Sequence, residues 1–173
     1  MCGMADFRLE PWDERALALE RRANTPEMQA NLGGVEADSV LTSRHRRILD
    51  TKLNDEGEFL LILVEGEPEP VGSVGYWERE WGGETVYELA WKVLTEFQGR
   101  GLAVGATRAA LARAAATGRH HWAHAYPYVG NAASNAVCAR AGFRLVDEVD
   151  FEYPKGTWIR CNNWRFDLRA ARP

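Results

Sequence analysis

The sequence is poor in cysteine: its 173 residues contain only three, Cys2, Cys138 and Cys161. Their odd number and wide spacing, with no pair at the spacing of zinc ligands, argue against a disulfide framework and predict a reducing, cytoplasmic location. Long apolar runs are also missing. The longest, 59–64, has the length of a strand, far below the roughly 20 residues of a membrane helix. The first residues lack the apolar segment of a signal peptide, so we expect neither a membrane protein nor an exported one.

An excess of basic residues is missing too. The 21 lysines and arginines are outnumbered by 25 aspartates and glutamates, which gives a net charge of −4. A protein that mainly grips nucleic acid needs a basic footprint for the phosphates, so we expect no nucleic-acid partner. The balance weakly favours cationic partners instead. The length matches one domain over 1–173, which can bury a core without a metal or disulfide.

Hydrophobic patterning predicts an alternation of strands and helices. Strands are expected at 6–12, 59–65, 71–80, 84–94, 119–126, 143–153 and 157–168. Helices are expected at 13–22, from Pro26 onward, at 37–53, at 103–116 with a stop at Gly118, and at 131–141 with a stop at Gly142. Within 84–94, residues 87, 89, 91 and 93 share one face and residues 86, 88, 90 and 92 the other. This order indicates an α/β domain with a mixed sheet.

The junction between the strand at 84–94 and the alanine-rich helix is the segment richest in chemical information. It reads Gln98-Gly99-Arg100-Gly101 and passes directly into the helix. A helix start has about four unpaired N–H groups and partial positive charge, and glycines let a ligand approach the backbone. The segment therefore predicts a phosphate or pyrophosphate cradle. It lacks the Gly-Lys-Ser/Thr of a Walker loop and the third glycine of a dinucleotide fingerprint. A plain strand-to-helix turn is the alternative for this motif alone.

A second segment follows after one further strand and contains Asn131, Ser134 and Gly142-Phe143. Together, Gln98-x-x-Gly101-x-Ala103, Asn131-x-x-Ser134 and Gly142-Phe143 resemble the GNAT superfamily of N-acetyltransferases. Within it, they look most like the ribosomal-protein alanine N-acetyltransferases. The resemblance implies the acyl-CoA N-acyltransferase fold, a single mixed, mostly antiparallel twisted sheet flanked by helices. It also implies acetyl-CoA as the cosubstrate and no metal.

The resemblance also implies which residues hold the cofactor. In the family, the pyrophosphate binds backbone amides of the turn, and the pantetheine arm pairs with the end of the preceding strand. The amides would be those of Gln98, Gly99, Arg100, Gly101, Leu102 and Ala103. The strand residues would be Trp91, Lys92 and Val93. Arg100 and Arg108 are candidates to neutralise phosphate charge, or are surface arginines. Asn131 matches an amide contact of the family, and a helix N-cap role suits it equally.

Acetyl transfer needs a group that accepts the amine proton and a group that protonates the departing thiolate. Glu88 is the candidate base, acting through water, because related enzymes have a glutamate at this place. The alternatives are a glutamate on a solvated strand face and a glutamate that only attracts a cationic acceptor. The family commonly has a tyrosine as the acid seven residues after the asparagine, where this chain has Cys138. Ser134 ranks first as the substitute and Cys138 second, and Tyr126 and Tyr128 are further candidates.

Two conspicuous clusters are expected to carry no chemistry. His120, His121 and His124 alternate in direction along a strand, so they are not expected to share a metal ion. The basic run 44–47 is expected on a solvated helix face.

We therefore expect an enzyme that moves acetyl from acetyl-CoA to a primary amine by direct attack. The amine belongs to a protein N-terminus or a small molecule. The alternative is a non-catalytic CoA-binding or sensor module, favoured by the missing tyrosine at Cys138. An exposed last strand could pair across a homodimer.

Overall fold

The computed structural model describes residues 6–53 and 56–171 of the chain. The strands are β1 (Phe7–Pro11), β2 (Gly57–Val64), β3 (Gly72–Trp81), β4 (Glu84–Val93), β5 (Trp122–Ala125), β6 (Arg144–Glu152) and β7 (Trp158–Asp167). The helices are α1 (Arg15–Ala23), α2 (Asp38–Leu53), α3 (Leu102–Thr117) and α4 (Ala132–Ala141), with a short 3₁₀ helix, η1 (Thr95–Phe97). This is the predicted order of elements.

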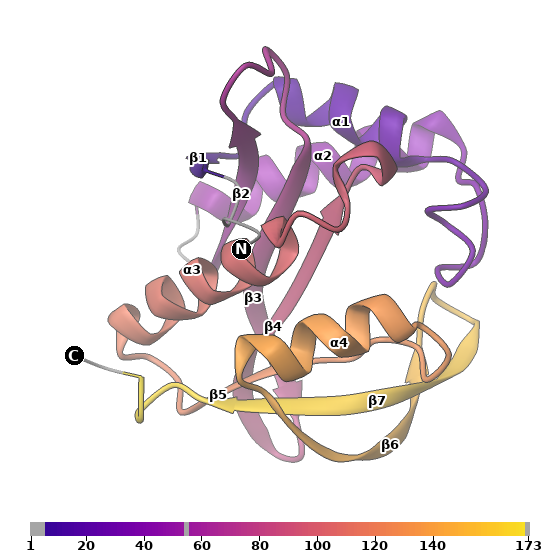
Figure 1. Ribbon diagram of the computed structural model, residues 1–173. Coiled ribbons are helices and arrows are strands. Elements are labelled where there is room, and N and C mark those ends of the chain that lie inside the picture. The colour runs from indigo at the N-terminus through magenta and orange to yellow at the C-terminus, as the bar shows by residue number, and fades with distance from the viewer. Residues whose placement is uncertain (1–5, 54–55, 172–173) are drawn as a thin grey trace.

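The seven strands form one sheet in the order β1-β2-β3-β4-β5-β7-β6. β4 and β5 run parallel, and every other neighbouring pair among the described strands is antiparallel. Helices α1 and α2 cover one face of the sheet, and α3 and α4 cover the other (Figure 1). The expected mixed, mostly antiparallel sheet flanked by helices is thus confirmed.

The core passes through β2, which lies between β1 and β3 and has helices on both faces of the sheet. Four consecutive side chains, Leu60 to Leu63, are at most 1% exposed. A strand buried on both faces needs apolar residues at every position, which the unbroken run supplies. Full burial of one such side chain stabilises the fold by about 1.5–3 kcal/mol.

Helix α3 lies close to the sheet because its contacting side chains are small. A Cβ at Gly105 would lie 2.6 Å from Cε1 of Phe7 in β1, so no larger residue fits there without a shift. Alanines fill much of the rest of this buried face. At the far end, the hydroxyls of Tyr87 and Thr117 lie 3.2 Å apart in a hydrogen bond. These contacts fix the start of α3 just beyond the end of β4.

β4 and β5 stop pairing and diverge halfway along β4. Their parallel ladder contains only Tyr87 opposite Ala123 and Glu88 opposite His124. β4 continues to Val93, but there it pairs with β3 alone. The end of β4 therefore has one free edge, at the place where Figure 1 shows β4 and β5 diverging.

Three predictions at the level of elements were wrong. The segment after Pro26 forms turns rather than a helix, because Asn24, Thr25 and the Gly33–Gly34 pair favour turns over continued helix. The strand expected from 119 begins only at Trp122. The last strand is not exposed at an edge, since β7 lies between β5 and β6, and the outer edge belongs to β6.

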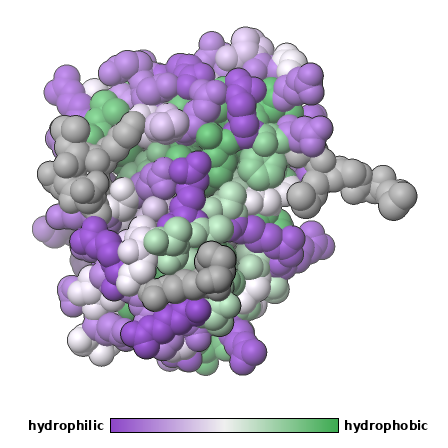
Figure 2. All heavy atoms as spheres, turned by 90° about the vertical axis from the view of Figure 1, so that its left-hand side faces the viewer, coloured by the Kyte–Doolittle hydropathy of each residue, from purple (hydrophilic) through white to green (hydrophobic). Residues whose placement is uncertain are grey.

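The surface on the side of β1 and α3 is predominantly hydrophilic, with apolar side chains visible between the polar ones (Figure 2). Among the described residues, no helix is long and apolar enough to cross a membrane.

Candidate functional site

The turn that enters α3 depends on two glycines. Gly99 and Gly101 have φ angles of 75° and 77°, in the left-handed region that side chains with a Cβ disfavour. The turn is tied to the strand before it, because Nε2 of Gln98 donates to the carbonyl of Val93 at 2.9 Å. Gly101 is also the N-cap residue of α3 and has no side chain to cap the helix. The sequence thus builds a helix start whose backbone is uncovered.

The amides of this helix start have no acceptor within the described part of the chain. The first backbone bond of α3 runs from Gly105 N–H to Gly101 O at 3.0 Å. The N–H groups of Gly101, Leu102, Ala103 and Val104 donate to none of the described residues. Because the helix dipole adds partial positive charge at the same point, the arrangement favours an anion.

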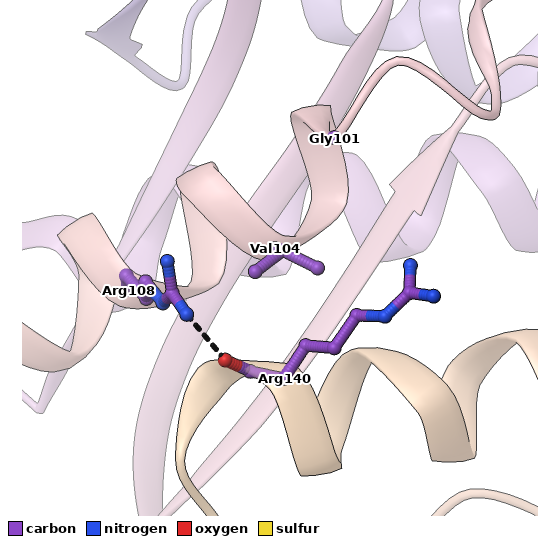
Figure 3. Close-up of a pocket in the computed structure, with 4 residues that line it drawn as sticks. All are labelled: Gly101, Val104, Arg108 and Arg140. Atoms are coloured by element: carbon purple, nitrogen blue, oxygen red, sulfur yellow. Dashed lines mark hydrogen bonds between the residues drawn. The ribbon is translucent and has the colours of Figure 1, made fainter. Parts of the chain in front are cut away.

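A hollow of about 350 Å³ lies beside these amides and is lined by Gly101, Val104, Arg108 and Arg140. Figure 3 shows the long side chain of Arg140 passing below Val104 toward the start of α3. Its guanidinium makes no ion pair or hydrogen bond with the described residues. No sequence pattern pointed to Arg140, since it lies in α4 and only the packing of α4 against α3 brings it here. It adds a free positive charge to the amide cradle.

The two arginines predicted for phosphate contact are both engaged within the protein. Arg108 donates from Nη2 to the carbonyl of Arg140 at 2.6 Å and so joins α3 to the end of α4 (Figure 3). Arg100 donates from Nη2 to the carbonyl of Glu96 at 3.1 Å, with its guanidinium 5.0 Å from the ring centre of Phe97. Arg108 still lines the hollow, whereas Arg100 curls back onto η1.

The free edge of β4 exposes backbone groups of alternate residues. The carbonyl of Lys92 lies against Gly72 of β3, so Lys92 and the residues two apart from it face β3. The N–H and C=O of Leu89 and Trp91 therefore point to the opposite edge, where β5 has already diverged. Of the strand residues predicted to contact the cofactor, this geometry favours Trp91 over Lys92.

The side chain of Lys92 is committed to a buried ionic network on the α1 side of the sheet. Its Nζ lies 2.6 Å from Oε1 of Glu20, which is only 2% exposed. Arg44 of α2 joins the other oxygen of Glu20 at 3.0 Å and Glu36 at 2.8 Å. The prediction that the run 44–47 is a solvated helix face was therefore wrong at Arg44, because the buried Glu20 requires cations. It was also wrong at His45, which is 4% exposed and accepts the indole N–H of Trp12 at 3.0 Å.

Helix α4 begins as its sequence predicts. Asn131 is the N-cap, and its Oδ1 accepts the N–H of Ser134 at 3.1 Å. The hydroxyl of Ser134 makes no hydrogen bond with the described residues, so it is free to meet a ligand. Cys138 lies one turn further on the same helix face and is 0% exposed, and burial raises the pKa of its thiol to about 12.

Asn135 is a structural residue that the sequence analysis overlooked. Its Oδ1 accepts from Nδ2 of Asn162 and from Nε1 of Trp164, each at 2.8 Å. Its Nδ2 donates to the carbonyls of Asn131 and Tyr128. These bonds fix the start of α4 against β7 and thereby fix the position of Ser134.

Glu88 lies on the face of β4 away from α3, together with Lys92, but its carboxylate is already paired. Arg79 of β3 forms an ion pair with Oε2, and the side chain of Trp77, its cross-strand neighbour, also favours the ionised carboxylate. The Glu88 side chain is 12% exposed. Burial raises the pKa of Glu88, while Arg79 and Trp77 act in the opposite direction.

Aromatic side chains pack around this ion pair. The ring of Tyr126 lies 4.7 Å from that of Trp81 and 4.8 Å from that of Phe151, centre to centre. The Tyr126 hydroxyl is buried and has no hydrogen-bond partner among the described residues. Burial raises its pKa, and the charge of Glu88 adds to this effect. Tyr128, the other tyrosine considered, is exposed.

The three histidines have separate partners. His120 lies 2.9 Å from Glu78, His121 lies 3.2 Å from Asp167, and Nδ1 of His124 lies 2.7 Å from Asn163. Across residues 6–53 and 56–171, no group of His, Cys, Asp and Glu side chains is arranged to hold a metal ion.

A strand with a free edge that leads to an uncovered helix start is the donor-site arrangement of acyl-CoA-dependent acyltransferases. The family model of the acetyltransferase (GNAT) domain matches residues 6–144, so the chain belongs to the GNAT acetyltransferase family. The predicted family is thereby confirmed. Among curated proteins, none matches the chain significantly.

Solved structures of several acetyltransferases have the same fold. An acetyltransferase from Salmonella typhimurium, which modifies the N-terminal serine of ribosomal protein L7/L12, has 20% identity and a TM-score of 0.75, with 96% of this chain and 97% of that one covered. RimL, solved with coenzyme A, has 18% identity and a TM-score of 0.78 over 98% of both chains. The microcin C7 self-immunity acetyltransferase MccE, solved with acetyl-CoA and AMP, has 17% identity and a TM-score of 0.76 over 96% and 94%.

Proposed function

We propose that this protein transfers acetyl from acetyl-CoA to a primary amine by direct attack of the amine on the thioester. One observation carries the proposal: the partnerless amides from Gly101 to Val104 lie at the end of a strand whose edge is free. The partnerless amides suit a diphosphate, and the free strand edge suits an amide-bearing arm that adds to the sheet. Coenzyme A contains both in sequence.

The donor site fits this ligand in charge as well as in shape. The protein is acidic overall, yet Arg108 and Arg140 both line the hollow beside the amides. Arg140 has no partner in the described structure, so it can pair with a phosphate without breaking an existing contact. We assign the diphosphate to the turn 98–104 and a phosphate contact to Arg140, with the pantetheine arm along Trp91.

The acceptor side supplies a base. An alkyl ammonium has a pKa of about 10, so the attacking amine must lose a proton. We assign proton acceptance, through water, to Glu88. Its burial supports this role, because a raised pKa makes the carboxylate a stronger base near neutral pH.

The departing thiolate needs a proton or a hydrogen bond. We assign this to Ser134, because its hydroxyl is without a partner in the described structure and lies at the start of α4, which covers the same face of the sheet as α3. Cys138 lies beneath it in the core, and a thiol with a pKa of about 12 that is 0% exposed has no path to the ligand. Direct attack leaves no covalent intermediate on the protein.

The second candidate is a CoA-binding module without catalysis. The observation in its favour is the Arg79–Glu88 ion pair, which occupies the carboxylate that catalysis would use. Such a protein would bind coenzyme A through the same cradle and release no thiol.

The test is a panel of amines incubated with the protein and acetyl-CoA, with free thiol as the readout. The panel contains a peptide with an N-terminal alanine, the same peptide with a blocked N-terminus, a polyamine and an aminoglycoside. We expect thiol release with at least one free amine and none with the blocked peptide. Calorimetry with coenzyme A and with ATP accompanies it. If none of the amines gives thiol release although coenzyme A binds tightly, the protein is the non-catalytic module. A preference for ATP over coenzyme A refutes both candidates.

A further inference from the structure

Glu88 is held by two residues of one neighbouring strand. Trp77 is its direct cross-strand partner in the antiparallel pair β3–β4, and Arg79 lies two positions along β3 on the same face. Arg79 forms an ion pair with Oε2 of Glu88, and the indole of Trp77 also favours the ionised form and so lowers the Glu88 pKa. The carboxylate therefore has a fixed orientation before any ligand arrives.

Arg79 is itself fixed by elements beyond β3. Its guanidinium carbon lies 4.6 Å from the ring centre of Phe151 in β6 and 5.7 Å from that of Tyr126, just after β5. Contacts of a guanidinium with aromatic faces are favourable, and more so when water is partly excluded. Arg79 thus connects β4 with the β5–β7–β6 half of the sheet.

The other groups that face Glu88 do not supply positive charge. His124 lies opposite Glu88 on β5, but burial lowers its pKa and it pairs with Asn163, so it is neutral near pH 7. Burial raises the pKa values of Tyr126 and Cys161, and the charge of Glu88 adds to the effect, so both stay neutral. Asp147 of β6, which also raises the Tyr126 pKa, is an aspartate and supplies no positive charge. Among the described residues, Arg79 is the one cation whose charge acts on Glu88.

We propose that Arg79 is a positioning residue that keeps the buried carboxylate of Glu88 ionised and oriented to accept a proton. The use of that carboxylate in catalysis rests on the proposed function above. The Arg79–Glu88 ion pair, which was the observation in favour of a non-catalytic module, then supports catalysis. Without a cation, burial alone would favour the protonated carboxyl, which accepts no proton.

The sign of the effect follows from the charges. Replacing Arg79 with glutamine removes the positive charge but not the burial, so the pKa of Glu88 rises. A neighbouring cation changes a carboxyl pKa by about 1–3 pH units, and we expect a rise of that order. In a plot of kcat/KM against pH, the ascending limb shifts to higher pH by the same number of pH units. At a pH below the limb, kcat/KM falls about tenfold for every pH unit that the limb moves.

The experiment compares wild type with R79Q, R79K and the control R113Q. Arg113 forms a similar arginine–glutamate pair with Glu58 at 2.8 Å, away from Glu88. The first readout is the titration of the Glu88 carboxyl by carbon-13 NMR, assigned by its absence in E88Q. The second is the pH profile of kcat/KM with the best amine of the panel. R79K tests rescue, because lysine restores the charge without the planar guanidinium.

In R79Q, we expect the Glu88 pKa and the ascending limb of kcat/KM to move together to higher pH. In R79K, both should return most of the way to the wild-type values. In R113Q, both should equal the wild-type values. An unmoved Glu88 titration in folded R79Q would falsify the proposal. If the titration moves but the rate limb does not, Arg79 does set the ionisation of Glu88, and the assignment of Glu88 as the base is what fails.

A second variant guards against an unfolded R79Q. Replacing Trp77 with phenylalanine keeps the ring that stacks 5.5 Å from Phe59 but removes the indole N–H. We expect a smaller rise in the Glu88 pKa, because a neutral donor stabilises the anion less than a cation does. A rise in W77F of about 1–3 pH units, the amount assigned to the cation, contradicts the assignment of the main effect to Arg79.

Discussion

The two ends of the candidate site differ in how much of their bonding capacity is already used. At the start of α3, the N–H groups from Gly101 to Val104 have no partner in the described chain. At Glu88, the carboxylate is already paired with Arg79 and lies beside Trp77, its cross-strand neighbour. The donor end, which is the start of α3, consists of backbone groups that are free to bind a ligand. The acceptor end, around Glu88, consists of side chains that already bind one another.

The two ends of the site depend on the sequence in different ways. Backbone amides are present wherever the turn forms, so the cradle needs only glycines at two positions and a helix that starts there. The ionisation of Glu88 depends on side chains from β3 and on the burial that β5, β6 and β7 create. We therefore expect substitutions to damage the two ends in separable ways, binding at one and turnover at the other.

E88Q is expected to give the largest separation between turnover and binding of coenzyme A. Loss of the base should lower kcat by about 10²- to 10⁴-fold, the range of general-base contributions, with the Kd for coenzyme A unchanged. Steady-state kinetics and calorimetry measure the two quantities. The matched control is E58Q, which also breaks an arginine pair, that of Arg113, and should keep kcat. Equal losses of kcat in both variants would show that the effect is structural.

The converse change is G101V, which should weaken binding of coenzyme A by about 10- to 100-fold. A β-branched residue at φ 77° costs about 1–2 kcal/mol and forces the turn to rearrange, which removes the aligned amides. Calorimetry measures the affinity. G66V is the control, since Gly66 has φ 84° in a distant turn with nothing near its Cβ. If both variants bind coenzyme A as wild type does, the cradle is not the binding site.

A finer division within the donor end comes from R140Q. A hydrogen bond to a charged group contributes about 1.5–3 kcal/mol, so we expect roughly a tenfold or greater rise in the Kd of coenzyme A. The salt dependence of binding should weaken as well, because one cation is lost. The exposed Arg46 of α2 provides the control R46Q. A Kd equal to that of wild type in R140Q would remove Arg140 from the site.

The smallest effect is expected on the leaving-group side. S134A should lower kcat by about 3- to 10-fold, the value of one neutral hydrogen bond, with little change in stability. C138A should keep kcat and instead lower the free energy of unfolding, because it leaves a small cavity in the core. Kinetics and denaturant unfolding of both variants measure the contrast. A loss of kcat confined to C138A would restore Cys138 as the donor.

Much of the fold was predictable because it depends on local pattern. The apolar run of β2, the alternation along β4 and the alanines of α3 each specify one element and the face it buries. The helix ends at Gly118 and Gly142 were predicted from the residues themselves and are confirmed. The segment after Pro26 failed for the opposite reason, because its turn-forming residues competed with a weak helical pattern.

The candidate site was predictable only where one segment makes it. Gly99, Gly101 and Asn131 stand next to the backbone they shape, so their spacing reveals them. Arg140 and Arg79 act on residues of other elements, so no spacing could point to them. Lys92 was expected at the cofactor because of its place in the strand, but its side chain turns to Glu20, a partner that is distant in the sequence.

The sequence by itself determined where the chain turns, which strand faces are apolar and where a helix starts with bare amides, because these properties depend on each residue and its neighbours along the chain. Tertiary structure alone decided that β4 and β5 diverge after Glu88, that Arg140 reaches the cradle and that Arg79 meets Glu88. Charge and burial act through space, so a carboxylate's protonation depends on neighbours that only the folded sheet brings together.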